Sequence, residues 1–392
     1  MKSLMEKQFA EPRKRYLERM IVRIRRSIEK KILRMIERIL PSAPYDRLII
    51  WWRRKVNGIK ESYPYAKVYS HKKSKDKYCV VRYTIPTMSI FAAGIQFLFK
   101  YYWLVNRGYV PIIDIEYTYS YKQGRLGENN IWDMCFEQPI PAKNLVNQPY
   151  VICIGEGFNP PDDPRLCMDL NGDEKDHFIH VRKENFKEYY AKAKKYVEPF
   201  WQIRDNILKE YDDEIGIKLQ GSRVLGVFLR EEFSEDTQLV HEGKAKRIYE
   251  NHPLLPSVKE TVEIIRDKKK EWKFDLIFVA SMCQDSIDIF QQEFGDMVFC
   301  IRRNRITFEE LKRSKMVFEK GDEELYRDTA TDEMRKAEYI KDVTYLKEVI
   351  ALSQCNYFIG GASSGAAIAL TMNGGEYEDI YLLEDIRKIN RY

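Results

Sequence analysis

The stretch Phe358-Ile359-Gly360-Gly361-Ala362-Ser363-Ser364-Gly365-Ala366-Ala367 lies near the end of the 392-residue chain and indicates its fold class. An apolar run, 357–359, predicts a buried strand; two glycines then turn the chain, and Ser363 begins an Ala-rich segment typical of a helix. A helix N-terminus carries about half a positive charge and unpaired N–H groups, and small side chains let a phosphate approach them. The stretch therefore predicts either a phosphate-binding turn or a plain turn with a serine N-cap, and alone it favours neither.

Outward from this stretch, strands and helices alternate through most of the chain. The second half predicts strands at 224–229, 275–280, 297–300, 357–359 and 380–383, with helices at 256–270, 284–294, 332–355 and 365–372. The first half predicts strands at 78–83, 109–115 and 150–154, a helix at 90–106 and a long amphipathic helix at 182–211 that would bridge two domains. The pattern predicts an α/β fold of two Rossmann-like domains facing a cleft, with ligands at the carboxyl ends of the strands.

Three regions follow from this reading of the chain. The pattern predicts a basic helical extension at residues 1–65, a first Rossmann-like domain at 66–215, and a second, nucleotide-binding one at 216–392. The seven cysteines are scattered and never form Cys-x-x-Cys, which indicates reduced core residues and no disulfide or zinc framework. With no signal-type segment and no apolar run of about 18 residues, we expect a cytoplasmic protein that does not span a membrane.

The net charge of +6 belongs to one segment of the extension. Residues 13–39 hold eleven Lys or Arg against three Glu, a balance of +8, so the rest of the chain sums to −2. Apolar residues recur there at three- and four-residue steps, and a run with paired tryptophans, 48–55, follows. This pattern favours binding of residues 13–55 to an anionic membrane surface, at the inner face of the cell membrane. A helix docked on its own body or a coiled-coil contact is the alternative; nucleic acid is not an expected partner.

Arg230 follows the first strand of the second half directly, in Leu225-Gly226-Val227-Phe228-Leu229-Arg230-Glu231-Glu232. A guanidinium at the carboxyl end of a buried strand could hold a diphosphate and stabilise the charge that develops as it leaves a sugar. The alternative is a surface pair between Arg230 and Glu231 or Glu232.

Several short motifs resemble the superfamily of GDP-fucose-dependent fucosyltransferases, and most closely its bacterial relatives associated with surface polysaccharides. The motifs are Gly226-Val227-Phe228-Leu229-Arg230, Asn251-His252-Pro253, Tyr345-Leu346-Lys347-Glu348-Val349, Cys355-Asn356-Tyr357-Phe358-Ile359-Gly360, Ser363-Ser364-Gly365, Gly108-Tyr109-Val110-Pro111-Ile112-Ile113-Asp114 and Asn130-Ile131-Trp132-Asp133. The resemblance implies a GT-B fold and an inverting, metal-independent glycosyltransferase. The donor would be a nucleotide sugar, GDP-fucose, and the acceptor a glycan or lipid-linked glycan.

The resemblance also implies roles for particular residues. Arg230 matches the arginine that contacts the donor diphosphate, and Glu348 the acidic residue that binds the nucleoside. The phosphate-binding pair is Ser363 and Ser364, followed by Gly365; the segment Asn251-His252 would shape the sugar pocket.

Two residues that would lie near the donor differ from the family's usual sequence. Phe228 stands where the family often has histidine, and Phe233 where several members have aspartate. They leave open a different nucleotide sugar, or a membrane-peripheral, glycan-binding scaffold without activity. Glu232 is the candidate base for the acceptor hydroxyl, with His252 the other candidate.

No metal ligand set is expected. The segment Asp169-x-Asn171-x-Asp173 lacks the glycine and the glutamate that a calcium loop needs, and His177-x-x-His180 has no third ligand nearby. The chain also lacks a P-loop and a Gly-x-Ser-x-Gly motif, which argues against phosphotransfer of that type and α/β-hydrolase chemistry.

Overall fold

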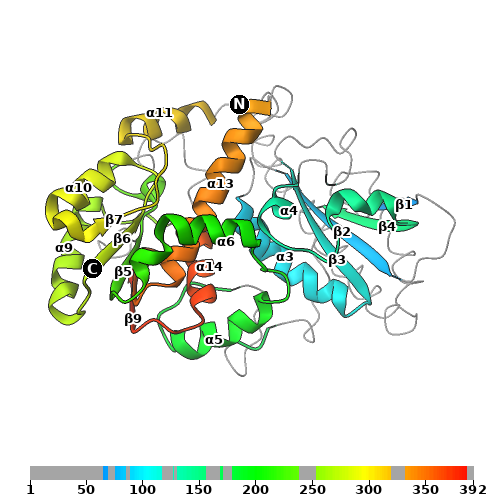
Figure 1. Ribbon diagram of the computed structural model, residues 1–392, viewed down its shortest axis with the longest axis horizontal. Helices are drawn as coiled ribbons and strands as arrows, with labels where there is room; N and C mark the ends of the chain where they lie inside the picture. Colours follow the sequence, from blue (N-terminus) through cyan, green and yellow to red (C-terminus); the bar gives the residue numbers. More distant parts are fainter. Residues whose placement is uncertain are drawn as a thin grey trace, which may run out of the picture.

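The computed structural model describes most of the chain beyond the basic extension (Figure 1). The described residues are 65–68, 76–84, 89–116, 127, 130–155, 168–170, 179–237, 253–318 and 332–385. Three features predicted from the sequence therefore lie outside them: the basic helix of residues 13–55, the segment Asn251-His252, and His177.

The first half contains a four-stranded sheet of order β1-β4-β2-β3. Its strands β2 (Lys77–Thr84), β3 (Tyr109–Glu116) and β4 (Tyr150–Gly155) are parallel, as the sequence predicts, and β1 (Tyr65–Val68) joins β4 antiparallel. The crossover helix α3 (Ile90–Val105) begins where the Ser89 side chain accepts a hydrogen bond from the Ala92 N–H at 3.2 Å. Two short helices follow, α4 (Ile131–Cys135) and the 3₁₀ helix η1 (Ala142–Asn147).

The second half contains a five-stranded, all-parallel sheet of order β7-β6-β5-β8-β9. The strands are β5 (Val224–Phe228), β6 (Leu276–Ala280), β7 (Val298–Phe299), β8 (Tyr357–Gly361) and β9 (Asp379–Leu383). The helices are α9 (Val258–Glu271), α10 (Gln284–Phe294), α11 (Phe308–Phe318), α13 (Asp332–Ser353) and α14 (Ser364–Asn373), with 3₁₀ turns η4 (Glu231–Phe233) and η5 (Gly295–Met297). All five strands lie where the sequence predicts them; helix α11 is an addition.

The single long helix predicted at 182–211 is wrong. The segment forms α5 (Phe186–Val197) and α6 (Asp205–Tyr211), followed by a π-helical turn (Asp212–Gly216) and α7 (Ile217–Leu219). Between α5 and α6 the backbone pairs with another segment: Glu137 N–H donates to the Gln202 carbonyl at 2.7 Å, and Arg204 N–H to the Cys135 carbonyl at 3.0 Å. These tertiary hydrogen bonds replace the helical ones, which an amphipathic pattern cannot reveal.

Helix α14 lies at the centre of the described structure, against α3, α5 and α13 (Figure 1). Small residues, Gly365, Ala366, Ala367 and Ala369, are buried along it and let its neighbours approach closely. One hydrophobic cluster consequently contains side chains from both halves of the chain, such as Phe97 and Phe358. The six cysteines that the structure describes are free thiols, and five of them are buried.

Candidate functional site

The carboxyl edge of the second sheet gathers most of the residues singled out in the sequence. Parallel pairing of β5 and β8 sets Phe228 beside Gly360, and a Cβ added at Gly360 would lie 3.2 Å from the Phe228 Cβ. Arg230 follows Phe228 by two residues and Ser363 follows Gly360 by three. The register therefore brings the segments that follow β5 and β8 to the same edge of the sheet, where open α/β sheets bind ligands.

Arg230 is held by two neighbours on its own turn. Its Nε lies 2.6 Å from the Glu232 Oε1, and its guanidinium lies over the Phe233 ring, 4.9 Å from the ring centroid. The Arg230 and Glu232 side chains remain 22% and 16% exposed. The pair expected as an alternative is thus present, with Glu232 and not Glu231, but it is part-buried and not at the surface. Phe233, one of the two residues that differ from the family pattern, thus makes a cation–π contact with Arg230.

Glu231, next in the chain, points away into the protein interior. Its Oε1 accepts hydrogen bonds from the Ser281 and Ser286 hydroxyls, the latter at 2.8 Å, while among the described residues its Oε2 has no partner. Burial raises the pKa of this carboxyl, and the two hydroxyls lower it only in part. Glu231 therefore anchors the η4 turn to the ends of β6 and α10.

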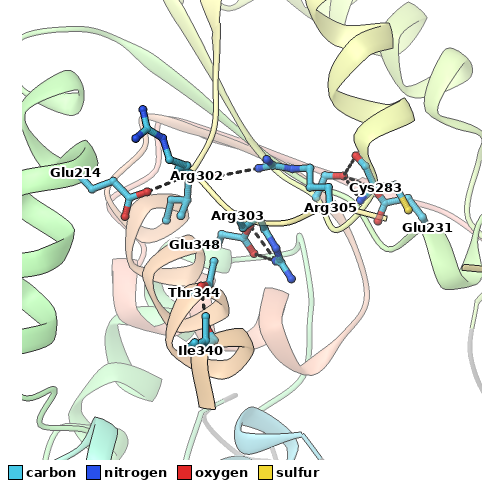
Figure 2. Close-up of polar contacts among 11 residues, drawn as sticks. Glu214, Glu231, Cys283, Arg302, Arg303, Arg305, Ile340, Thr344 and Glu348 are labelled. Atoms are coloured by element: carbon cyan, nitrogen blue, oxygen red, sulfur yellow. Dashed lines mark hydrogen bonds and ion pairs between the residues drawn. The ribbon is translucent and has the colours of Figure 1, made fainter. Parts of the chain in front are cut away.

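Glu348 is buried beneath an arginine that the sequence reading missed. Both of its oxygens face the Nη1 of Arg303, at 3.1 and 3.2 Å (Figure 2). The Glu348 side chain is 3% exposed and that of Arg303 is 13% exposed. Burial raises the pKa of Glu348 to about 7, against the opposing effect of the Arg303 and Arg305 charges. The signal for Arg303 was present, since Arg302-Arg303-Asn304-Arg305 follows β7 at the same sheet edge.

The start of α14 is a capped turn. The Ser363 hydroxyl oxygen accepts a hydrogen bond from the Ala366 N–H at 3.2 Å, and Ser363 and Ser364 are half-buried. A Cβ at Gly365 would lie 2.1 Å from the Tyr345 hydroxyl oxygen, so close packing alone requires glycine there. The capped-turn reading is confirmed, and phosphate binding by the same turn stays a prediction.

Phe228, the second departure, lies under this turn. Its ring stacks on Tyr345, with centroids 6.1 Å apart and an interplanar angle of 19°, and it is buried. A Cβ at Gly365 would also lie 2.9 Å from the Phe228 Cζ. The ring thus fills the space between α13 and α14, as part of the core.

A buried ion pair lies near the carboxyl end of the first sheet. Arg82 and Asp114 are cross-strand neighbours, with Nε and Oδ2 2.9 Å apart, and both side chains are buried. Nearby, the Asn130 Oδ1 caps α4 by accepting from Trp132 N–H and also accepts from Ile115 N–H. The first-half motifs that carry the resemblance are therefore neighbours in space.

The metal-ligand segments considered in the sequence, around Asp169 and His180, form no metal site among the described residues. No group of three or more His, Cys, Asp or Glu residues is arranged to hold a metal ion there. Asp169 and His180 each have a backbone N–H that donates to a tyrosine hydroxyl, of Tyr196 and Tyr189 respectively. No described helix is long and apolar enough to cross a bilayer.

Comparison with known proteins finds likeness only among solved structures. No family model and no curated protein sequence matches the chain. The fucosyltransferase NodZ from Bradyrhizobium is 13% identical, with a TM-score of 0.42 over 76% of this chain and 92% of that one. The apo form of POFUT1 is 10% identical, with a TM-score of 0.40 over 80% of this chain and 99% of that one. The chain is thus distantly similar to these two solved structures.

Proposed function

We propose that the chain is a glycosyltransferase that transfers fucose from GDP-fucose to a glycan or a lipid-linked glycan. The supporting observation is the convergence on one sheet edge of Arg230 after β5, the Ser363 turn before α14, and the Arg303–Glu348 pair. Two arginines beside a helix N-terminus suit a diphosphate better than a neutral ligand.

In the proposed reaction the bond between the sugar anomeric carbon and the diphosphate oxygen breaks. Negative charge then grows on the leaving diphosphate. The Arg230 guanidinium and the N–H groups at the start of α14, with the Ser363 and Ser364 hydroxyls, stabilise that charge. The acceptor oxygen attacks from the opposite face, so the anomeric configuration inverts, and no metal ion takes part. The resemblance, taken alone, assigns Glu348 to the nucleoside end of the donor.

Glu232 is the proposed base. Its Oε1 accepts a hydrogen bond from the Arg230 Nε at 2.6 Å. A diphosphate competes for the same guanidinium, and this competition releases the carboxylate to accept the proton of the acceptor hydroxyl. Asn251 and His252 shape the sugar pocket in this proposal, and residues 66–215 bind the acceptor.

The proposed place of action is the inner face of the cell membrane, where residues 13–55 bind anionic lipid and keep the enzyme near a lipid-linked acceptor of surface-polysaccharide synthesis. The basic charge of that segment supports this. Co-sedimentation with anionic vesicles tests it: a chain lacking residues 1–60 should stay in the supernatant, and unchanged binding would contradict the anchor.

Arg230→Ala tests the catalytic proposal. We expect it to lower kcat/KM for fucosyl transfer by about 10²- to 10³-fold, or roughly 2–4 kcal/mol, as for other groups that stabilise a developing oxyanion. Arg266→Ala is a matched control, because Arg266 pairs with Glu263 and Glu293 on the exposed surface of α9 and α10. Activity of the Arg230 variant within a few-fold of the control would remove Arg230 from the reaction.

Two alternative functions are compatible with the same fold: use of a different nucleotide sugar, and glycan binding without catalysis. The burial of Phe228 and the position of Phe233 favour considering both. Neither aromatic ring supplies the polar contact that histidine or aspartate would make to a sugar donor. A different nucleotide sugar predicts a thermal shift with UDP or CDP and none with GDP, since a ligand that binds the native state must raise stability. A non-catalytic glycan-binding scaffold predicts no shift with any of the three.

A further inference from the structure

We propose that Arg303 is a second phosphate-binding cation of the donor site and that Glu348 positions it, instead of contacting the nucleoside directly. This assignment rests on the proposed function and changes the role that the resemblance implies for Glu348.

The order of burial carries the proposal. Glu348 lies behind Arg303: the Glu348 side chain is 3% exposed, and the Arg303 side chain is 13% exposed. Both contacts to Glu348 use the Arg303 Nη1, at 3.1 and 3.2 Å. Both hydrogen bonds leave the Nη2 and Nε of Arg303 without a hydrogen-bond partner among the described residues. A ligand that enters this edge of the sheet therefore meets guanidinium N–H donors first, and these match a phosphate.

The segment that carries Arg303 is fixed on both sides. Before it, the Arg302 N–H donates to the Glu214 Oε1 at 2.8 Å; after it, the Ile306 N–H donates to the Met282 carbonyl at 3.2 Å. Arg305 folds back and donates to the Ile301 carbonyl at 2.8 Å (Figure 2). The backbone on both sides of Arg303 is thus held by the fold itself, which reduces the ordering cost of binding a ligand.

The charged groups around Glu348 favour the binding of an anion. Arg303 and Arg305 both act on Glu348, and among the described residues the buried Arg305 Nε has no hydrogen-bond partner. The buried Glu231 carboxyl also acts on Glu348, so two carboxyls whose pKa values are raised by burial face two permanent cations. Direct contact of Glu348 with a nucleoside would instead require Arg303 to move away from a buried carboxylate, and such pairs are costly to break.

The test compares GDP with guanosine, by calorimetry on the full chain. Wild-type protein should bind GDP more tightly than guanosine. Arg303→Ala should weaken GDP binding by about 10- to 100-fold, as expected for hydrogen bonds to a charged group, and leave guanosine within about twofold. Glu348→Gln, which keeps the side-chain shape and removes the charge, should weaken GDP binding by less.

Arg302→Ala is the matched control, since its exposed side chain points away from Glu348 in Figure 2; we expect unchanged GDP binding. Arg303→Ala that binds GDP as tightly as wild type, or more tightly because Glu348 is uncovered, overturns the proposal. Equal losses of GDP and guanosine in Glu348→Gln also overturn it. If Arg303→Ala alone is unstable, the double variant Arg303→Ala/Glu348→Gln removes both buried charges and should bind GDP weakly. Wild-type protein that binds none of GDP, UDP and CDP overturns the proposed function itself.

Discussion

Glu348 shows how burial and charge compete at a single residue. Its side chain loses nearly all contact with water, which disfavours the ionised form, while Arg303 and Arg305 favour it. The outcome is a pKa of about 7, raised from an ordinary value of 4.5. The carboxyl group therefore changes its charge near neutral pH, and with it the strength with which Arg303 is held.

This shift predicts a pH dependence of stability. Between pH 4.5 and about 7 the folded state holds more protons at Glu348 than the unfolded state does, so the contribution of this residue to the free energy of unfolding falls as pH rises through that window. Glu348→Gln should abolish that part of the slope. Urea denaturation of both proteins at several pH values measures it, and equal slopes would contradict the prediction. Three charged or titratable groups act on Glu348: Arg303, Arg305 and Glu231. All three are the same in the wild-type protein and in Glu348→Gln.

At the scale of the element, α14 combines a structural cap with a proposed ligand site. Ser363 caps the helix through one hydrogen bond, and Gly365 is buried against Tyr345. Helix α9 has a stronger cap, in which Ser257 and Glu260 exchange hydrogen bonds, but it lies outside the proposed site. The two caps allow stability to be separated from binding.

We predict that Ser363→Ala and Ser257→Ala each lower the free energy of unfolding by about 1 kcal/mol, the usual cost of losing a serine cap. Only Ser363→Ala should also weaken GDP binding, because its hydroxyl lies at the turn that is proposed to bind phosphate. Urea denaturation and calorimetry measure the two effects. Equal GDP affinities in both variants would show that the Ser363 turn is a cap and nothing more.

At the scale of the whole molecule, the two sheets share a hydrophobic cluster. Phe97 on α3 contacts Trp132 and Phe200, and it belongs to the same cluster as Phe358 on β8. A shared core of this kind couples the two halves of the chain, whereas domains with a small interface move and unfold more independently.

This coupling predicts one cooperative unfolding transition for the described part of the chain. Phe97→Ala should cost about 3–5 kcal/mol, as for other buried aromatic residues. It should lower the protection of amides in the second sheet as well as the first. Hydrogen exchange measured on β2 and on β5 tests this, and protection lost only in β2 would mean that the two sheets unfold separately.

The sequence by itself determined the elements whose signals are local. Apolar runs bounded by glycine or charge placed the eight parallel strands of the described residues, and alternation with helices implied their parallel pairing. That pairing was enough to bring Arg230 and Ser363 to one sheet edge.

Only the tertiary structure decided which partner each side chain has. Three such features depend on residues far apart in the chain. They are the pairing of Arg303 with Glu348, the stacking of Phe228 on Tyr345, and the hydrogen bonds that interrupt the helix between α5 and α6. No periodicity records such contacts, because they depend on packing between elements and on the loss of water around each group. The burial of Glu348 against the part-exposed Arg303 side chain is the consequence that matters most for the proposed function.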